Sequence, residues 1–397
     1  MLAGAMRTAI CGGGPAGLYL AILLRRQDPG HEVVVVERNG PDDTFGFGVV
    51  FSDRTLSYLR DADAESHDEI QRTFETWDNV DVVHRGRKVS IRGNRFSGIA
   101  RLSLLKILQR RAGALGVDVR YRTEVRDLEG PPFRDADLVV GADGVNSLVR
   151  RTFEDDFEPS LERRRSPYIW YGTPRLFHGL TLTFREAEAG LFIAHSYKFD
   201  RRLSTFIVEC DEETFGRAGF AGAPEPEVRR ALEAAFADDL EGAPLVSNAS
   251  RWISFIVVKN RRWHRENVVL VGDALHTVHF SIGSGTKLAL EDAIALARAL
   301  GEAGLGARPA RADVAAALAR FEAARRPVVL DYQEVAGESM RWFETARRFL
   351  PLDPVRFAYE VMTRTPRVDR ENLRQRDPEF VTLYERTLAG TEPDARA

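Results

Sequence analysis

The clearest pattern in the chain lies near its start, where two short apolar runs flank a glycine turn and a longer apolar run. Residues 7–11 (RTAIC) are short and mostly apolar, as expected for a buried strand. After a glycine turn, an apolar run continues to Arg25-Arg26-Gln27, which predicts a helix that ends at Gln27. A second apolar strand follows in HEVVVVERN at 31–39. This order predicts a βαβ unit with parallel strands.

The turn inside this unit carries a GxGxxG motif. Its residues are Gly12, Gly14, Pro15, Ala16 and Gly17. In a βαβ unit the motif predicts a dinucleotide site, because the glycines allow a tight turn and let a pyrophosphate approach the helix N-terminus. Glu37 stands 20 residues after Gly17, where a carboxylate accepts hydrogen bonds from an adenosine ribose, and Arg38 could cover the adenine. The alternative is a glycine turn without a ligand.

Two further apolar strands are each followed by a turn that contains an aspartate. Residues 138–150 read LVVGADGVNSLVR and include Asp143 and Gly144. Residues 268–293 read VVLVGDALHTVHFSIGSGTKLALEDA and include Asp273. A domain that binds NAD alone has no reason to carry either motif. The plainer alternative is that both aspartates cap helices, as aspartates after strands often do.

Together the three motifs resemble those of the group A flavoprotein monooxygenases, which have the para-hydroxybenzoate hydroxylase fold, and the similarity extends from about Arg7 to Pro327. The resemblance implies an α/β protein with a Rossmann-like FAD-binding domain of the GR2 type, an inserted antiparallel β-sheet substrate domain and a helical C-terminal tail. It also implies bound FAD and a transient reductant. NADH and NADPH are not distinguished, because only one dinucleotide fingerprint is present.

The resemblance assigns roles to individual residues. Asp273 corresponds to the aspartate that contacts the ribityl chain, and Asp143 with Gly144 to the pair that supports FAD and nicotinamide binding. Further cofactor positions are Arg101 for the FAD phosphates, Val125 for adenine, and Gly283, Gly285 and Thr286 at the helix start that faces the flavin. Phe280 and Lys287 replace a common proline and a common asparagine, so the wall beside the flavin is altered.

The motif positions require a discontinuous FAD-binding domain, which we assign to 1–76, 99–166 and 262–340. The inserted substrate domain is assigned to 77–98 and 167–261, and a C-terminal helical segment to 341–397. Alternating apolar and polar residues at 180–184, 192–197 and 204–209 predict half-buried antiparallel strands. Residues 311–350 predict an Ala-rich helix interrupted at Pro327.

Some runs outside these motifs are more specific. They are GFGVVFSD at 46–53, YIWYGT at 168–173, FIAHSYKFDRRLSTFIVEC at 192–210 and HFSIGSGT at 279–286. These runs resemble two subgroups: the aryl-CoA 5-hydroxylases that act on salicylyl-CoA or 2-aminobenzoyl-CoA, and the tryptophan-derived indole hydroxylases of violacein biosynthesis. The tail at 355–381 resembles the aryl-CoA subgroup. Bifunctional relatives continue into a flavin reductase domain; because this chain stops at Ala397, ring reduction is expected to be absent.

The resemblance therefore implies an aromatic ring hydroxylase that uses FAD, NAD(P)H and O2. Through a flavin hydroperoxide it would convert salicylyl-CoA to gentisyl-CoA by oxygenation at ring position 5. Hydroxylation of a tryptophan-derived indole is the main alternative. A flavin halogenase lacks its WxWxIP signature here, and a non-catalytic flavin-fold binding protein stays open.

The substrate residues are predicted from strand alternation and from the specific runs. A period of two places Ile193, His195 and Tyr197 on one face, where His195 is the catalytic candidate that hydrogen-bonds the ring substituent. A lone strand histidine is more often structural. The other substrate candidates are Phe47, Tyr171, Tyr197, His279 and Phe280. Two basic runs are candidates for CoA phosphates: Arg85, Arg87, Lys88, Arg92 and Arg95, and Arg163, Arg164 and Arg165.

Composition narrows the remaining classes. With 44% apolar and 29% charged residues the chain is an ordinary folded protein, and its net charge of −3 does not indicate a nucleic-acid partner. Cys11 and Cys210 lie far apart, which argues against a disulfide framework or a zinc site. The longest uncharged stretch, 8–24, is too rich in glycine for a membrane span. We expect a cytoplasmic enzyme without bound metal, and a homodimer stays open.

Overall fold

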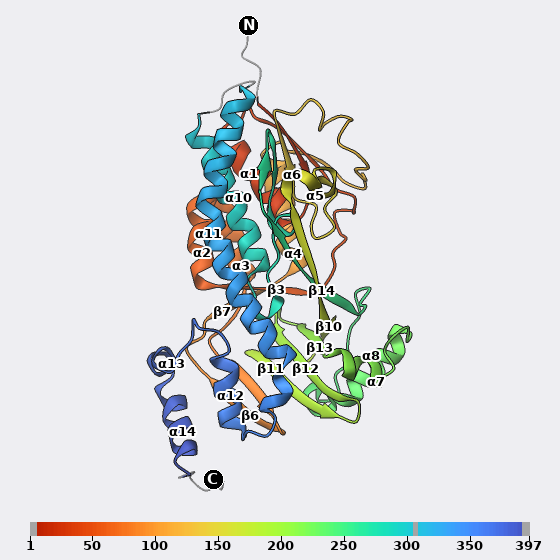
Figure 1. Cartoon of the computed structure of the whole chain (residues 1–397), viewed down its shortest axis with the longest axis vertical. Helices are drawn as coiled ribbons and strands as arrows, with labels where there is room; N and C mark the ends of the chain where they lie inside the picture. Colours follow the sequence, from red (N-terminus) through yellow and green to blue (C-terminus); the bar gives the residue numbers. More distant parts are fainter. Residues whose placement is uncertain (1–5, 305–308, 391–397) are drawn as a thin grey trace.

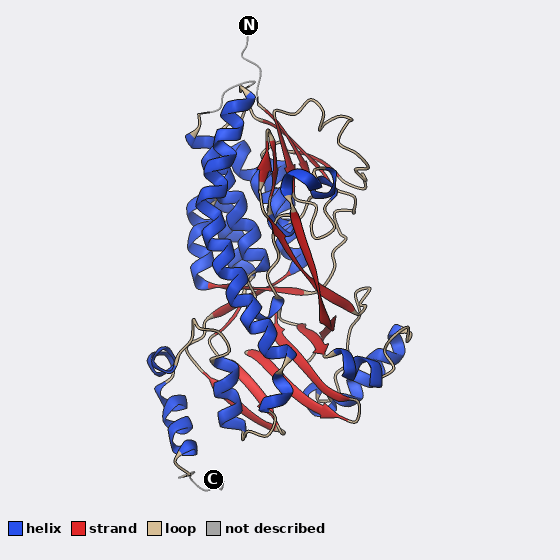
Figure 2. Cartoon of the chain, viewed as in Figure 1, coloured by secondary structure: helices blue, strands red, loops and turns tan. Residues whose placement is uncertain are grey.

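The computed structural model describes residues 6–304 and 309–390, which form three sheets and the helices around them (Figures 1 and 2). The first sheet has the order β15-β16-β9-β1-β2-β8. Its strands are β1 (Arg7–Cys11), β2 (Glu32–Val36), β8 (Asp118–Arg120), β9 (Leu138–Gly141), β15 (His264–Arg265) and β16 (Val268–Leu270). All neighbours are parallel except β15 and β16.

Parallel pairing brings the carboxyl ends of three strands of this sheet to one edge. Cys11 of β1 pairs with Gly141 of β9, which pairs with Leu270 of β16. The helices that pack around this sheet include α1 (Pro15–Gln27), α4 (Arg101–Ala114) and α10 (Gly285–Glu302). The predicted βαβ unit is present, β1 has the predicted bounds, and α1 ends at Gln27 as predicted but begins already at Pro15, inside the glycine motif. The three motifs therefore meet at one edge, as the fold inferred from the resemblance requires.

The second sheet has the order β14-β10-β13-β12-β11-β5-β6 and is antiparallel except for β11 and β5. Its strands are β5 (Val80–His84), β6 (Arg87–Ile91), β10 (Pro159–Thr173), β11 (Leu180–Ala187), β12 (Gly190–Lys198), β13 (Ser204–Cys210) and β14 (Ile253–Asn260). A small sheet lies between the two larger ones (Figure 2); it contains β3 (Gly48–Ser52), β4 (Glu75–Trp77) and β7 (Phe96–Ala100).

The strands of the second sheet are more deeply buried than their alternation predicted. Every residue of β13 is buried, and in β12 only the terminal residues are partly exposed. One face packs on α11 (Arg311–Glu344) and α12 (Pro354–Met362), and the other packs on α7 (Glu212–Arg217) and α8 (Glu225–Ala235). The prediction of half-buried strands is wrong here, because helices cover both faces.

The remaining helices are short and lie at the surface or cover the sheets. They are α2 (Asp53–Ala62), α3 (Ala64–Thr73), α5 (Leu148–Thr152), α6 (Glu154–Phe157), α9 (Ala237–Leu240), α13 (Arg370–Arg376) and α14 (Pro378–Leu388), with 3-10 turns η1 (Gly272–Ala274), η2 (Phe280–Ile282) and η3 (Ala346–Phe349). In the described part of the chain, none of the helices combines the length and apolar character that a membrane span requires.

Helix α11 joins the first sheet to the second and is the long blue helix of Figure 1. Near its start Phe321 is buried in the core of the first sheet, and near its end Phe343 is buried against the second sheet. The predicted interruption at Pro327 is wrong, since the helix is continuous over 34 residues. Pro327 is exposed, and packing on both sides of it holds the helix despite the missing N–H.

The replacement Pro327→Ala tests this explanation. Alanine restores an N–H to the helix and removes the ring, so we expect the free energy of unfolding to rise by roughly 1 kcal/mol, less than the full intrinsic preference because the proline also restricts the unfolded chain. Thermal unfolding of the FAD-loaded protein measures the effect. Val328→Ala, an exposed neighbour, is the control. A lower melting temperature for Pro327→Ala would show that the proline itself stabilises the helix.

Candidate active site

The first wall of the site is the glycine turn after β1. A Cβ on Gly12 would lie 2.3 Å from the Ala142 carbonyl oxygen, and one on Gly17 would lie 2.1 Å from the Gly12 carbonyl oxygen. Gly12 also has a φ of +108°. Both positions therefore need glycine to hold the turn itself. Gly14 differs, because a Cβ there would meet no atom within 4 Å. Gly14 instead borders a cavity, together with Pro15 and Ala16.

Two helix N-termini face this cavity. Helix α1 begins at Pro15 after Gly14, and α10 begins at Gly285 after Ser284; neither has a side-chain cap. The first N–H groups of each helix are therefore free to bind an anion or a carbonyl oxygen. The predicted residues Gly283, Gly285 and Thr286 all border the cavity beside α10.

The cavity has a volume of about 1110 Å³ and extends from these turns to the second sheet. This volume exceeds the range of about 300–1,000 Å³ that is usual for one small ligand. It has room for a dinucleotide and a second molecule. Among the described residues, no cluster of three or more His, Cys, Asp or Glu side chains is arranged to hold a metal ion.

Asp273 and Arg101 are two oppositely charged side chains of the cavity that interact electrostatically. Both side chains border it, as predicted. Burial raises the pKa of Asp273, and the nearby Arg101 counteracts part of that rise. Burial likewise lowers the pKa of Arg101, while Asp273 opposes the change. The pair offers an acceptor for hydroxyl groups and a donor for phosphate.

Asp143 is held by hydrogen bonds at the start of α5, and its role inferred from the family stays a prediction. Its carboxylate accepts hydrogen bonds from Ser147 Oγ at 2.5 Å and from the Leu148 N–H at 2.6 Å. These bonds satisfy N–H groups at the start of α5, whose N-cap residue is Ser147, and the neighbouring Gly144 borders the cavity. Glu37 accepts a hydrogen bond from the Gly13 N–H at 2.7 Å and so braces the glycine turn.

Two predicted adenine contacts lie outside the cavity wall. Arg38 is exposed directly after Glu37, and Val125 is partly buried against the core of the first sheet. Neither side chain borders the cavity. Their predicted contacts with adenine stay predictions.

The opposite wall is formed by one face of the second sheet, with His195, Tyr197 and Phe280 at the cavity as predicted. His195 Nε2 lies 2.6 Å from Glu209 Oε1, and both side chains are buried. The Tyr197 hydroxyl donates to the Gly48 carbonyl oxygen at 2.8 Å, which fixes its ring. The Phe280 ring lies 5.3 Å from the His195 ring and 4.7 Å from that of Tyr168. The wall is aromatic with one polar pair.

Three predicted substrate residues do not border the cavity: Tyr171, Phe47 and His279. Tyr171 is fully buried on the other face of the sheet, because β10 alternates and turns Tyr168 and Trp170 to the cavity instead. Phe47 packs against Gly172 and Phe199 outside the cavity.

His279 lies behind Phe280, and its ring is 2.9 Å from the Ser281 hydroxyl. Burial lowers the pKa of His279 to about 4, so the ring is neutral at neutral pH. It supports the wall from behind.

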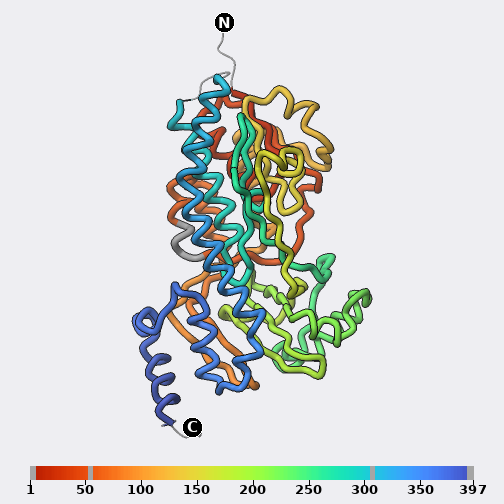
Figure 3. The backbone as a smooth tube through the Cα atoms, in the orientation of Figure 1, coloured from red at the N-terminus to blue at the C-terminus, as the bar shows by residue number. Residues whose placement is uncertain are grey.

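The C-terminal tail completes the site and was not predicted to reach it. Helix α12 contacts β5 and β6, and Figure 3 shows the tail beside that early segment. Met362, Arg364 and Thr365 border the cavity directly after or within the end of α12. Glu209 was missed too, although its spacing on β13 places it on the same face as Ile207, another cavity residue.

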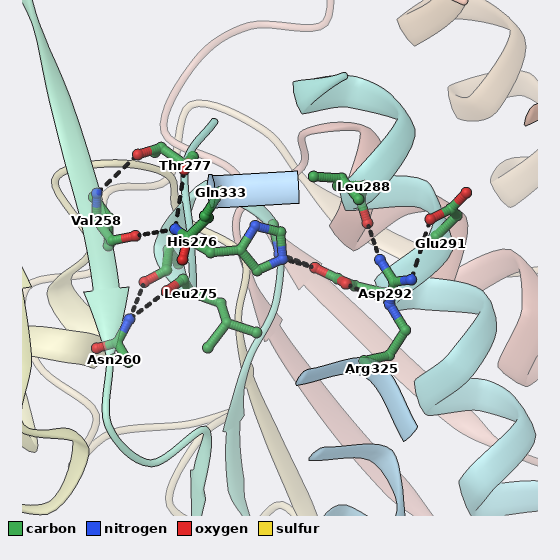
Figure 4. A network of polar contacts seen from close by, with 12 residues as sticks. Val258, Asn260, Leu275, His276, Thr277, Leu288, Glu291, Asp292, Arg325 and Gln333 are labelled. Atoms are coloured by element: carbon green, nitrogen blue, oxygen red, sulfur yellow. Dashed lines mark hydrogen bonds and ion pairs between the residues drawn. The ribbon is translucent and has the colours of Figure 1, made fainter. Parts of the chain in front are cut away.

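A buried ionic network fastens the α10 side of the site to α11 (Figure 4). Asp292 of α10 accepts from His276 at 2.7 Å, from the Gly272 N–H at 3.0 Å and from Arg325 of α11 at 3.0 Å. Although burial opposes ionisation, His276 and Arg325 hold the pKa of Asp292 below its ordinary value. Gln333 of α11 donates to the Thr277 carbonyl oxygen at 3.1 Å. The network fixes the turn that carries Asp273.

These features fit FAD. The glycine turn has no side chain at Gly14 to obstruct a pyrophosphate, Arg101 offers a cation, and Asp273 offers an acceptor for the ribityl hydroxyls. The uncapped start of α10 presents N–H groups to the edge of a flavin ring.

Comparison with known proteins identifies the family. The family model described as "FAD binding domain" matches residues 5–132 and 133–333. The chain belongs to this family. It is 42% identical over 386 residues to salicyloyl-CoA 5-hydroxylase from a Streptomyces species, a match that covers 95% of this chain and 72% of the relative.

It is also 40% identical over 338 residues to 3-hydroxy-4-methyl-anthranilyl-[aryl-carrier protein] 5-monooxygenase from Streptosporangium sibiricum, covering 85% of this chain and 89% of the relative. A solved structure of 2-methyl-3-hydroxypyridine-5-carboxylic acid oxygenase superposes with a TM-score of 0.69 at 22% identity, covering 89% of this chain and 98% of that one. The inferred fold and FAD are confirmed. The chain is an FAD-dependent aromatic monooxygenase.

The two turn glycines give a paired test of the FAD site. Gly14→Ala adds a methyl group that meets no protein atom, so we expect normal folding of the apoprotein but FAD binding weakened roughly tenfold or more. Gly17→Ala collides with the Gly12 carbonyl oxygen and should lower the stability of the apoprotein as well. FAD titration and thermal unfolding of each apoprotein separate the effects. Equal loss of apoprotein stability in both variants would contradict this assignment.

Removal of Arg325 tests the ionic network. Arg325→Met removes the arginine partner of buried Asp292 and leaves His276 as its side-chain partner, and we expect the free energy of unfolding to fall by about 3 kcal/mol. Arg298→Met on α10, whose partner Glu302 is exposed, should change it far less, because solvent screens an exposed ion pair. Urea unfolding monitored by tryptophan fluorescence measures both. Similar values for the two variants would show that the network is not stabilising.

Proposed function

We propose that the protein hydroxylates the ring of an aryl thioester, with NAD(P)H as the reductant and O2 as the oxidant. The specific reaction is the oxygenation of salicylyl-CoA at ring position 5 to gentisyl-CoA. The observation that carries this is the 42% identity with salicyloyl-CoA 5-hydroxylase over 95% of the chain. An alignment of that extent includes most of the tail, which the family model does not match beyond residue 333. A second relative is named for an aryl group on a carrier protein, which is also a thioester.

The cavity supports an aromatic ring beside the cofactor. Bound FAD supplies the chemistry of hydride acceptance and oxygen activation. The protein's residues bind and orient the ring: Leu182, Ile207 and Phe280 give apolar walls, and Tyr168 extends the aromatic surface. Such walls exclude water and hold a flat ring at low entropic cost. His195, whose Nε2 is paired with Glu209, is available to the ring's ortho substituent.

The CoA tail has candidate contacts but no assigned site. Of the two predicted basic runs, Arg163 borders the cavity, whereas Arg164 pairs with Glu344 at 2.6 Å and Lys88 with Asp81 at 3.6 Å. Arg367 and Arg376 of the tail also border the cavity. Arginines at its edge support a phosphorylated arm, since guanidinium groups bind phosphate in bidentate fashion.

A substrate panel tests this function. FAD-loaded protein is offered salicylyl-CoA, 2-aminobenzoyl-CoA, free salicylate and a tryptophan-derived indole, each with NADH or NADPH. We expect consumption of reductant coupled to a gain of one oxygen only on a CoA thioester, as measured by product mass. Turnover only on the indole would favour the other hydroxylase class. Reductant oxidation without any oxygenated product would point to a flavin protein that has lost the reaction.

A further inference from the structure

Arg364 is a partly buried cation of the tail that borders the cavity. Its Nε donates to Ser339 Oγ at 2.9 Å, and its two Nη atoms donate to the carbonyl oxygens of Val361 at 2.7 Å and Ser281 at 3.1 Å. The guanidinium carbon lies 5.4 Å from the centre of the Phe343 ring. These contacts hold the group at the cavity wall.

The charge of Arg364 has no direct counter-ion in the described part of the chain, where every hydrogen-bond acceptor of Arg364 is neutral. Burial lowers the pKa of Arg364 to about 10, and the field of Glu209 opposes that change, so the group is protonated at neutral pH. A partly buried cation that is held by neutral acceptors at a cavity wall favours an anionic ligand.

His195, which is paired with Glu209, borders the same cavity as Arg364. His195 and Arg364 share Phe343 as a neighbour. The Phe343 ring centre lies 4.9 Å from that of His195 and 5.4 Å from the guanidinium carbon of Arg364. Phe280 packs on His195, and Ser281, next in the chain, accepts the hydrogen bond from Arg364. The cation and the pair are therefore brought together by the same residues from η2 and α11.

The hydrogen bond to Glu209 sets the tautomer of His195. A carboxylate only accepts, so in the neutral ring Nε2 carries the hydrogen and Nδ1 the lone pair. Among the described residues, Glu209 is the sole hydrogen-bond partner of this ring, and His195 borders the cavity. His195 can accept a proton from a ligand next to the cation.

We propose that Arg364 and His195 bind an oxygen substituent of the aromatic ring as an anion, with Arg364 supplying the charge and His195 the proton acceptor. The proposal rests on the proposed function, whose substrate salicylyl-CoA is 2-hydroxybenzoyl-CoA. The ring oxygen in question is its ortho hydroxyl group. The O–H bond breaks, its electron pair stays on oxygen, and the proton forms a bond with Nδ1. No other reactant is consumed. The phenolate then lies between Arg364 and the protonated imidazole, whose charge Glu209 balances.

The same cation would also bind a carboxylate, which is the charged group of a free aryl acid. The two sources differ in a measurable way. In a thioester the carboxyl group is masked, so only the ring hydroxyl can become anionic. Salicylate, benzoate and their two CoA thioesters therefore form a complete set of probes for the anion.

The first experiment uses the wild-type holoenzyme. Difference absorbance spectra are recorded for bound 2-hydroxybenzoyl-CoA in the absence of reductant, with benzoyl-CoA as the reference for the flavin shift. We expect the bound 2-hydroxybenzoyl group to show the longer-wavelength absorbance of a phenolate at neutral pH. A bound ligand that keeps the spectrum of the neutral phenol would overturn the proposal.

The second experiment removes the charge. Arg364→Met should weaken binding of 2-hydroxybenzoyl-CoA roughly tenfold to a hundredfold more than binding of benzoyl-CoA, the usual effect of losing a charged hydrogen bond. Arg364→Lys should recover part of the difference. Arg374→Met is the control. Arg374 of α13 pairs with Glu385 of α14 at 2.6 Å and does not border the cavity. Equal weakening of both thioesters by Arg364→Met would mean that Arg364 only holds the tail in place.

The outcomes separate this proposal from the proposed function. In one outcome neither thioester binds to the wild-type protein, whereas salicylate and benzoate bind equally and both depend on Arg364. The anion is then a carboxylate, and the thioester function and the ring-oxygen assignment both fail. If 2-hydroxybenzoyl-CoA is hydroxylated yet Arg364→Met affects both thioesters alike, the function stands and the anion site is wrong. Should Arg364→Met not fold, the wild-type spectrum and Arg364→Lys still decide.

Discussion

The whole site depends on a close approach of backbone at the carboxyl ends of three parallel strands. Gly12 after β1 leaves no room for a Cβ beside Ala142, and Gly141 at the end of β9 leaves none beside Val149. Gly272 after β16 takes a φ of +59°. Because the turn after β1 is tight, α1 begins close to the sheet edge, and its start borders the same cavity as the start of α10, which follows η1 and η2. A dinucleotide site follows from this packing alone.

The substrate part of the cavity depends on a different constraint, which is the rigid connection made by α11. This helix packs on α10 through the buried Arg325–Asp292 pair and reaches the second sheet with Trp342 and Phe343. The tail then folds back along β5 and β6 and adds Arg364 to the wall. Elements from both ends of the chain thus enclose one volume. The position of the aryl ring relative to the cofactor is set by long-range packing.

Much of the first sheet could be predicted from the sequence, because its signals are local. The strand at 7–11, the helix at 15–27 and the glycine spacing each depend on neighbouring residues alone. The substrate wall was harder to predict. Tyr171 was chosen where Tyr168 and Trp170 face the cavity, since a strand's alternation is visible in the sequence but the face that meets the cofactor is not. Glu209 and Arg364 need pairings across strands and a tail docked from far away, which no local pattern contains.

The central claim is that one cavity holds FAD at the glycine turns and an aryl ring against the His195 wall. The most direct measurement is an experimental structure of the FAD-loaded protein with 2-hydroxybenzoyl-CoA, obtained without reductant. The account predicts the pyrophosphate beside Gly14 and the aryl ring in contact with His195, Phe280 and Arg364. An aryl ring bound instead at the β10–β14 end of the cavity, beside Arg163 and Arg251, would contradict it.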